Sequence, residues 1–337
     1  MQTITKKRML YKSKVEYMSG PGVYTMNHVL GCSHGCKYPC YAYLIAKRFG
    51  QIDSYEDWCN PKLIENTISL LETELKTRRK EPISRVHLCF TTDPFPCGPL
   101  NERGYPDWTD AEQNLFHDIV TTTMKSIELI NSYGIPDTVL TKGLLPHFDI
   151  DEGPNGEKAT LLRHGLGGYA GSPHPDNEYG ISLVSLNENF RKEYEPNAVS
   201  YAERIANLKS LHDASCKTWV SMEPFPALTY AGHIERYSYE DSDYPDNVVS
   251  QGRSDFTSWL SRRADSNEHV MLVDCLNAIK FTDKIVFGRW NYNNNMPCDV
   301  NSPDQWYERA EQIVRDFCIE NNIEYIIKKS PKKPNNT

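Results

Sequence analysis

Long apolar runs and basic charge are both scarce in this chain, and each shortage limits its function. No apolar run in the 337 residues approaches the roughly 20 that a membrane-spanning helix requires, so we expect no membrane segment. Lys and Arg number 37 against 45 Asp and Glu, which gives a net charge of −8. General nucleic-acid binding favours a broad basic surface. A nucleic-acid partner stays open, but the charge does not support it.

No apolar stretch follows the basic residues Lys6 to Arg8, as it would in a secretory signal. We therefore expect a cytoplasmic protein. Thiols stay reduced in that compartment, so the 10 cysteines are not expected to form disulfides. A chain of this length suits one large α/β domain or two smaller ones.

Three cysteines lie close together on one segment. The run from Gly31 to Tyr41 reads GCSHGCKYPCY, which spaces Cys32, Cys36 and Cys40 as C-x3-C-x3-C. It follows the β-prone stretch 23–30, so the thiols should lie on a loop that leaves a strand. Three thiols leave one position of a tetrahedral metal open, and a 4Fe-4S cluster held by three thiolates keeps one iron free. The pattern predicts a metal centre that can bind a further ligand.

A structural zinc site is the main alternative, with His34 as the fourth ligand beside the three thiols. Zinc half-sites usually have the spacing C-x2-C, and no second Cys or His pair at that spacing occurs in the chain. A disulfide framework is disfavoured by the expected reducing compartment. The pattern therefore favours an iron–sulfur cluster over zinc.

The cysteine loop resembles that of the radical S-adenosylmethionine superfamily, in the branch that contains spore photoproduct lyase. Members of that branch typically read G-C-x-H-G-C-x-Y-C-Y, and this chain has one extra residue, Pro39, before its third cysteine. Shorter matches follow in the same order: the pair Thr141-Lys142, then Glu195-Pro196, and then Arg204. Together these motifs cover about residues 24–225.

The resemblance implies cofactors and residue roles. Cys32, Cys36 and Cys40 would hold a 4Fe-4S cluster, and S-adenosyl-L-methionine (SAM) would chelate the fourth iron. An electron from a flavodoxin- or ferredoxin-type donor would cleave SAM to methionine and a 5′-deoxyadenosyl radical, which abstracts hydrogen from an unknown substrate. The expected contacts to SAM are Lys142 at its carboxylate, Ser185, Asn187 and Asn189 at its ribose, and Tyr38 and Tyr41 near the adenine or the cluster.

Strand-like and helix-like segments alternate along the chain, which predicts a parallel α/β sheet. Together with the resemblance, this predicts a partial (β/α)6 barrel over residues 23–290. An N-terminal extension, 1–22, precedes it, and a C-terminal helix, strand and basic tail, 291–337, follow. Two segments, about 151–179 and 226–265, interrupt the alternation and are predicted to be inserts, the first a long loop or lid rich in Gly and Pro.

The substrate is not identified by the sequence. In the branch with photoproduct lyase, a cysteine near the end of the second strand donates hydrogen, and Cys89 and Cys97 fall in that neighbourhood. Two other functions stay open. A DNA-lesion lyase of the photoproduct type should bind duplex DNA in a salt-dependent way. A non-enzymatic zinc or Fe–S interaction protein should bind no SAM.

Overall fold

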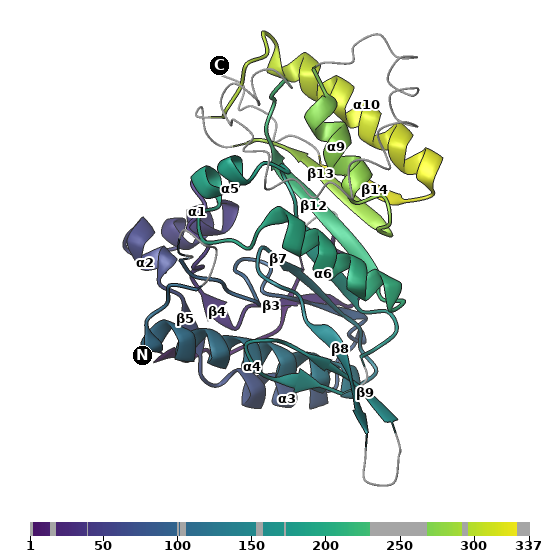
Figure 1. Cartoon of the computed structure of the whole chain (residues 1–337). Helices are drawn as coiled ribbons and strands as arrows, with labels where there is room; N and C mark the ends of the chain where they lie inside the picture. The colour runs from purple at the N-terminus through teal and green to yellow at the C-terminus, as the bar shows by residue number, and fades with distance from the viewer. Residues whose placement is uncertain are drawn as a thin grey trace.

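The computed structural model describes residues 3–13, 18–38, 40–99, 101, 106–152, 158–171, 173–229, 268–291 and 296–328. Their main feature is an eight-stranded sheet with the order β14-β13-β12-β11-β7-β6-β3-β2 (Figure 1). Its strands are β2 (Tyr11–Lys12), β3 (Val23–Met26), β6 (Arg85–Leu88), β7 (Asp137–Thr141), β11 (Glu178–Ser182), β12 (Lys217–Phe225), β13 (Lys284–Arg289) and β14 (Glu324–Ile327).

Every neighbouring pair in this sheet is parallel except β2 with β3. From β3 to β14 the strands stand in the sheet in their chain order. A doubly wound sheet would reverse direction at a switch point, whereas a (β/α) barrel adds each strand beside the last. The predicted α/β fold is therefore confirmed, with a mostly parallel sheet in the strand order of an open barrel.

Helices connect the strands, as parallel pairing requires. They are α1 (Tyr41–Arg48), α2 (Tyr55–Cys59), α3 (Thr67–Lys76), α4 (Asp110–Ser132), α5 (Glu188–Tyr194), α6 (Tyr201–Asp213), α9 (Val270–Ala278) and α10 (Pro303–Asn321). The T-x-x-E pattern at Thr109 and Glu112 predicts a capping box, and this capping box is present at the start of α4. In Figure 1, α1, α2 and α5 lie together at the left of the sheet.

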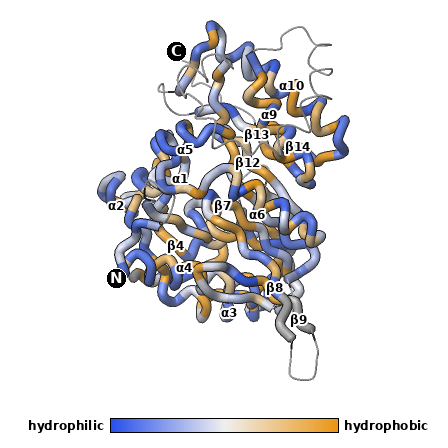
Figure 2. Tube along the Cα trace, viewed as in Figure 1, coloured by the Kyte–Doolittle hydropathy of each residue, from blue (hydrophilic) through white to orange (hydrophobic). Residues whose placement is uncertain are grey.

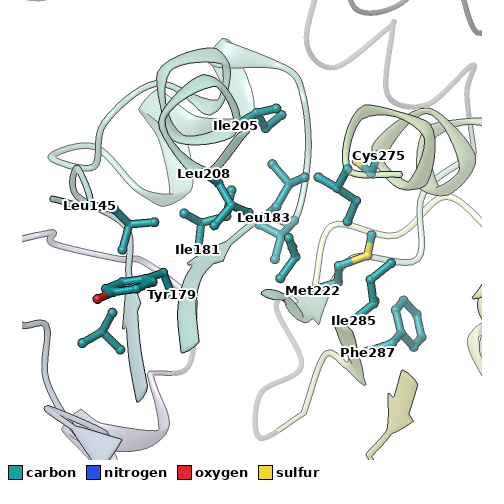
Figure 3. Packing of buried hydrophobic residues seen from close by; sticks show 14 of the residues in the cluster. Leu145, Tyr179, Ile181, Leu183, Ile205, Leu208, Met222, Cys275, Ile285 and Phe287 are labelled. Atoms are coloured by element: carbon teal, nitrogen blue, oxygen red, sulfur yellow. The ribbon is translucent and has the colours of Figure 1, made fainter. Parts of the chain in front are cut away.

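Apolar faces of the helices pack on the sheet to form the core. Figure 3 shows Leu208 of α6 beside Ile181 of β11, and Cys275 of α9 near Met222 and Ile285. All five side chains are fully buried. Burying an aliphatic side chain of this size contributes about 1.5–3 kcal/mol relative to exposing it. This packing holds the strands, and so fixes where their carboxyl ends lie.

The outer helices show the same division between faces. In α10 the buried residues recur at helical spacing, and they are Trp306, Tyr307, Ala310, Ile313, Val314, Phe317 and Cys318. Hydrophilic and hydrophobic stretches accordingly alternate along this helix (Figure 2). Within the described residues, no helix is long and apolar enough to cross a membrane.

The long loop predicted for 151–179 is wrong. Strands β8 (His147–Glu152), β9 (Lys158–Arg163) and β10 (Tyr169–Ala170) form an antiparallel three-stranded sheet there. The Gly and Pro residues that indicated a loop surround these short strands instead of filling the segment. Most of the second predicted insert, from residue 230 onward, lies outside the described residues.

Apolar residues at helical spacing predict a helix over residues 61–79, and the beginning of that prediction is also wrong. Lys62–Ile64 is strand β5, which pairs with β1 (Thr3–Ile4) on one side and β4 (Val29–Leu30) on the other. The predicted domain boundaries stay a prediction. Because β14 is the edge strand next to β13, the proposed boundary at 290 falls between two paired strands.

Candidate active site

The cysteine loop is fixed by hydrogen bonds to three other segments. The Cys32 amide donates to the Trp58 carbonyl of α2 at 2.8 Å, and the Lys37 amide donates to the Tyr194 carbonyl of α5 at 2.9 Å. The Ser33 hydroxyl donates to the Cys97 carbonyl at 2.5 Å. The loop therefore lies between the segments that follow β6 and β11, and such segments surround the active site in barrel folds.

Glycine is required where the loop meets α2. Gly31 has φ +92°, and a Cβ at this position would lie 2.6 Å from the Trp58 carbonyl oxygen. Any other residue would be strained by the backbone conformation and would push the two segments apart. Gly31 thus allows Cys32, the first of the three cysteines, to lie against the end of α2.

The three predicted ligand thiols are half-buried and interact with one another. Burial raises the pKa of Cys32, and charges on Asp93, Cys36 and Cys40 raise it further. Burial also raises the pKa of Cys36 to about 12, against the opposing positive charge of Lys142. The loop therefore gathers thiols that stay protonated unless a positive centre binds them.

Cys40 precedes the first turn of α1. Burial raises the pKa of Cys40, while the backbone amides of Tyr43 and Ala42 and the charge of Lys142 oppose the rise. Helix amides and a nearby lysine are groups that stabilise a thiolate. A bound metal centre deprotonates its thiol ligands. The donor set therefore fits an iron–sulfur cluster, with three thiolates on one loop and cationic groups beside them.

His34, the fourth ligand in the zinc alternative, contacts Asp93 and Asn197. Its Nε2 lies 2.8 Å from Asp93 Oδ2, and its Nδ1 lies 3.4 Å from the Asn197 carbonyl oxygen. No group of three or more His, Cys, Asp or Glu side chains in the described part of the chain is arranged to hold a single metal ion. A 4Fe-4S cluster makes a different demand, because each thiolate binds a different iron. The geometry is unfavourable to the zinc alternative.

Asp93 joins the loop to the ends of two strands. Its Oδ1 accepts a hydrogen bond from the Thr141 hydroxyl at 2.6 Å, and its Oδ2 accepts one from the Lys142 amide at 3.0 Å. Burial opposes ionisation, but the His34 charge and these hydrogen bonds hold the pKa of Asp93 below its usual value. The ionised carboxylate thereby positions His34 and the backbone of Lys142.

Glu195 is a second buried carboxylate beneath the loop. It accepts hydrogen bonds from the Tyr38 hydroxyl and, at 2.6 Å, from the Arg204 guanidinium, and Lys142 Nζ lies 3.6 Å away. Burial would raise its pKa, but the charges of Arg204 and Lys142 lower the pKa of Glu195 to about 2. Arg204 also donates to the carbonyls of Val199 and Ser182.

Two of the predicted SAM-binding residues lie together at this cluster. Lys142 Nζ is 5.6 Å from the centre of the Tyr38 ring, whose far side packs edge-on against Trp290. Tyr38 is buried. Lys142 thus lies beside both Glu195 and the Tyr38 ring, and its charge acts on Cys36 and Cys40.

The remaining predicted SAM contacts have local roles in the structure. The Ser185 hydroxyl accepts from the Asn187 amide, and the Asn187 side chain caps α5 by accepting from the amides of Asn189 and Phe190. Tyr41 is 45% exposed at the start of α1. Their contacts with SAM stay a prediction.

The two candidate hydrogen donors are both buried. Cys89 follows β6 with φ +50°, and its Sγ lies 3.3 Å from His28 Nδ1. His28 in turn contacts the Thr123 hydroxyl at 2.8 Å, so Cys89 belongs to a buried polar group. Cys97 contributes its carbonyl to the cysteine loop. Neither role as a hydrogen donor is tested by this geometry.

Glu223 and Arg289 follow predicted strands in the sequence, where a barrel fold would direct them to the site, but both form ion pairs elsewhere. Glu223 of β12 pairs with Lys328, which follows β14. Arg289 of β13 donates to Glu311 of α10 at 2.8 Å. These pairs join the last strands and α10, and they are not directed at the cysteine loop.

Asp93, Glu195 and Arg204 are the site residues whose importance is clearest only in three dimensions. Asp93 lies 48 positions from Thr141 along the chain, and Glu195 lies 157 positions from Tyr38. Glu195 and Arg204 belong to a short motif of the resemblance, which was the one signal that could have marked them. The sequence does not indicate that the Glu195 carboxylate and the Arg204 guanidinium form an ion pair across the loop between α5 and α6.

Comparison with known proteins gives structural matches only. No protein-family model matches the chain, and no curated protein does. A variant of spore photoproduct lyase aligns with 97% of this chain and 81% of its own, at 11% identity and a TM-score of 0.47. Another variant, with bound dinucleoside spore photoproduct, has 12% identity with the same coverage and TM-score.

SuiB from Streptococcus suis, bound to S-adenosylmethionine, aligns with 92% of this chain and 48% of its own, at 10% identity and a TM-score of 0.37. The spacing of Cys32, Cys36 and Cys40 differs by the single residue Pro39 from the motif that the cysteine loop resembles. The present chain is similar to these proteins in fold class over most of its length. Matches at this level of identity concern the fold, and the chemistry of the site depends on the chain's own residues.

Proposed function

We propose that the chain is a radical SAM enzyme whose cluster is bound by Cys32, Cys36 and Cys40. The observation that carries the proposal is the placement of three interacting thiols on one pinned loop, beside the strand ends and next to Lys142. His34, the residue that would complete a zinc site, is instead committed to Asp93. This arrangement supports a cluster with one iron open to SAM.

When bound, the cluster supplies the electron that cleaves SAM to methionine and a 5′-deoxyadenosyl radical. The chain's own residues bind SAM and orient it. Lys142 is the cation whose charge lowers the pKa of Cys36, its Nζ lies 3.6 Å from Glu195, and its amide is fixed by Asp93, so it is suited to hold the SAM carboxylate. Tyr38 and Trp290 exclude water from one side of this position.

The first test is anaerobic purification and reconstitution with iron and sulfide, followed by an assay for 5′-deoxyadenosine from SAM with dithionite as reductant. We expect a brown protein with about four iron atoms per chain, since the proposed cofactor has four, and 5′-deoxyadenosine in the wild type. Metal analysis of the protein as isolated serves as the control for zinc.

Two outcomes would contradict the proposal in different ways. A colourless protein with one equivalent of zinc would show that the loop is a structural zinc site and would exclude a radical SAM enzyme. A brown protein that never cleaves SAM would show that the loop, with its extra Pro39, holds a cluster that lacks the reaction.

An electron donor must reach the cluster, and α1 offers a suitable surface. No Asp or Glu occurs between Glu16 and Asp53 in a chain whose net charge is −8. Leu44 and Phe49 on this segment are 40% and 70% exposed. Lys47 and Arg48 beside them are also exposed. We propose that an acidic flavodoxin or ferredoxin docks here, about one to two and a half helix turns from Cys40.

Reversing the charge of this surface should slow electron delivery without harming the site. With Lys47→Glu and Arg48→Glu combined, we expect 5′-deoxyadenosine formation driven by a reduced flavodoxin to fall by about tenfold or more at low salt, because opposite charges accelerate encounter. With dithionite the rate should not change. Lys76→Glu with Lys209→Glu, the same charge change on α3 and α6, is the matched control. Equal losses in both double variants would contradict this docking surface.

A further inference from the structure

The short segment between α5 and α6, residues 195–199, lies against the cysteine loop. The Asn197 side chain donates a hydrogen bond through Nδ2 to the Ser33 carbonyl at 2.8 Å, and the Asn197 amide donates to the His34 carbonyl at 3.2 Å. Both carbonyls belong to the spacer between the first two cysteines of the loop. Asn197 therefore holds the backbone that sets how far apart these two thiols lie.

The same segment also contacts the end of β7. The Val199 amide donates to the Lys142 carbonyl at 3.0 Å, and Glu195 Oε1 lies 3.6 Å from Lys142 Nζ. Asn197 stands midway between Glu195 and Val199 in the chain. The cysteine loop and the lysine that we expect to bind SAM are thus joined through one short stretch of backbone.

Two buried arginines hold this segment from its other side. Arg191 donates through Nη1 to the Ala198 carbonyl at 2.7 Å, and Arg204 donates through Nε to the Val199 carbonyl at 2.8 Å. Arg191 is 6% exposed and Arg204 is fully buried. Hydrogen bonds from charged donors are stronger than those between neutral groups. A segment fixed in this way can hold two other parts of the site at a constant distance from each other.

We propose that Asn197 is a positioning residue, which keeps the cysteine spacer in place relative to Lys142, so that a cluster bound by the loop has a fixed position relative to the lysine. The proposal rests on the proposed function. Asp93 also links the two parts, but it reaches the loop through the His34 side chain, whereas Asn197 acts on the loop backbone. Replacing residues that orient metal ligands from outside typically changes metal affinity or activity by about 10–100-fold.

Asn197→Ala tests this role, because it removes the hydrogen bond to the Ser33 carbonyl and leaves every proposed ligand in place. In the reconstituted variant we expect an iron chelator to remove the cluster faster than in the wild type by about tenfold or more. The electron paramagnetic resonance spectrum of the reduced cluster should respond to SAM only at a concentration higher by about tenfold or more. Asn197→Asp, which keeps the size of the side chain but lacks the Nδ2 donor, should show the same losses and serves if alanine impairs folding.

Asn66→Ala is the matched control. The Asn66 side chain donates to the Lys6 carbonyl at 2.8 Å and accepts from the Lys6 amide at 3.0 Å, so it makes the same kind of contact with backbone outside the cysteine loop. Its rate of iron loss and its response to SAM should match those of the wild type. The urea midpoint of cluster-free Asn197→Ala should fall by no more than that of Asn66→Ala, which loses two side-chain hydrogen bonds instead of one.

The outcomes separate this inference from the proposed function. A wild-type rate of iron loss and a wild-type SAM response in both Asn197 variants would show that Asn197 does not position the loop, while the enzyme proposal would stand. Equal changes in Asn197→Ala and Asn66→Ala would indicate a general loosening of the fold and would also overturn the positioning role. Wild-type protein that takes up no cluster would overturn both proposals.

Discussion

Cys36→Ala is expected to abolish cluster binding and 5′-deoxyadenosine formation while leaving the fold intact. The charges of Lys142 and Glu195 both act on the Cys36 thiol, so its loss removes the proposed ligand that lies beside these two groups. Loss of one half-buried sulfur should cost about 1 kcal/mol of stability, a typical value for one substitution. Iron content, the visible absorption spectrum and the SAM cleavage assay measure the first effect, and urea denaturation measures the second.

The same experiment on Cys40 examines the extra residue in the motif. Cys40→Ala should behave like Cys36→Ala if Pro39 leaves the third thiol in position. Cys216→Ala is the matched control, because burial alone raises the pKa of that thiol and it shows no coupling to the three others. Wild-type iron content in Cys40→Ala would show that another thiol supplies the third bond.

Strands and helices with strong local signals could be predicted from the sequence. The sequence predicts strands at 137–141 and 284–289, which are the bounds of β7 and β13, because each segment has β-branched or other apolar residues between polar ends. The capping residues Thr109 and Ser200 mark the starts of α4 and α6 in the sequence, because a capping side chain accepts a hydrogen bond from an amide of its own helix. Patterns of this kind depend on residues that are neighbours in the chain.

Elements stabilised by distant partners could not be predicted in this way. Lys62–Ile64 has the apolar spacing of a helix, but pairing with β1 and β4 makes it a strand. The segment α2 has five residues, too few to show a helical period. Both elements support the cysteine loop, and both were missed because tertiary contacts override local propensity.

The residues of the candidate site divide in the same way, into neighbours in the chain that could be predicted and distant residues that could not. The thiols were found because they are close in sequence and their residue type indicates metal chemistry. The carboxylates that position the loop were not assigned that role, because Asp93 and Glu195 act on residues that are far away in the chain. A buried charge can be recognised only when its burial and its partner are both known. The structure shows both the burial and the partner of Glu195, so the effect of replacing this residue can be predicted.

Glu195→Gln is expected to lower the free energy of unfolding by about 3–5 kcal/mol, because it leaves the Arg204 charge buried without its partner. Neither side chain is exposed in the folded protein. Urea denaturation of the cluster-free protein measures the loss. Asp213→Asn, which breaks the exposed pair of Asp213 with Lys209, should cost less than about 1 kcal/mol and is the matched control.

The stability of the wild type should also depend on pH through Glu195. The folded state holds the pKa of this carboxyl at about 2, below its ordinary value of 4.5. The unfolded state therefore binds the proton first as the pH falls, and the contribution of Glu195 to stability, complete above 4.5, is lost between about 4.5 and 2. Glu195→Gln should lack this part of the acid transition. A variant with the same urea midpoint and the same acid profile as the wild type would show that Glu195 does not hold Tyr38, Lys142 and Arg204 together beneath the cysteine loop.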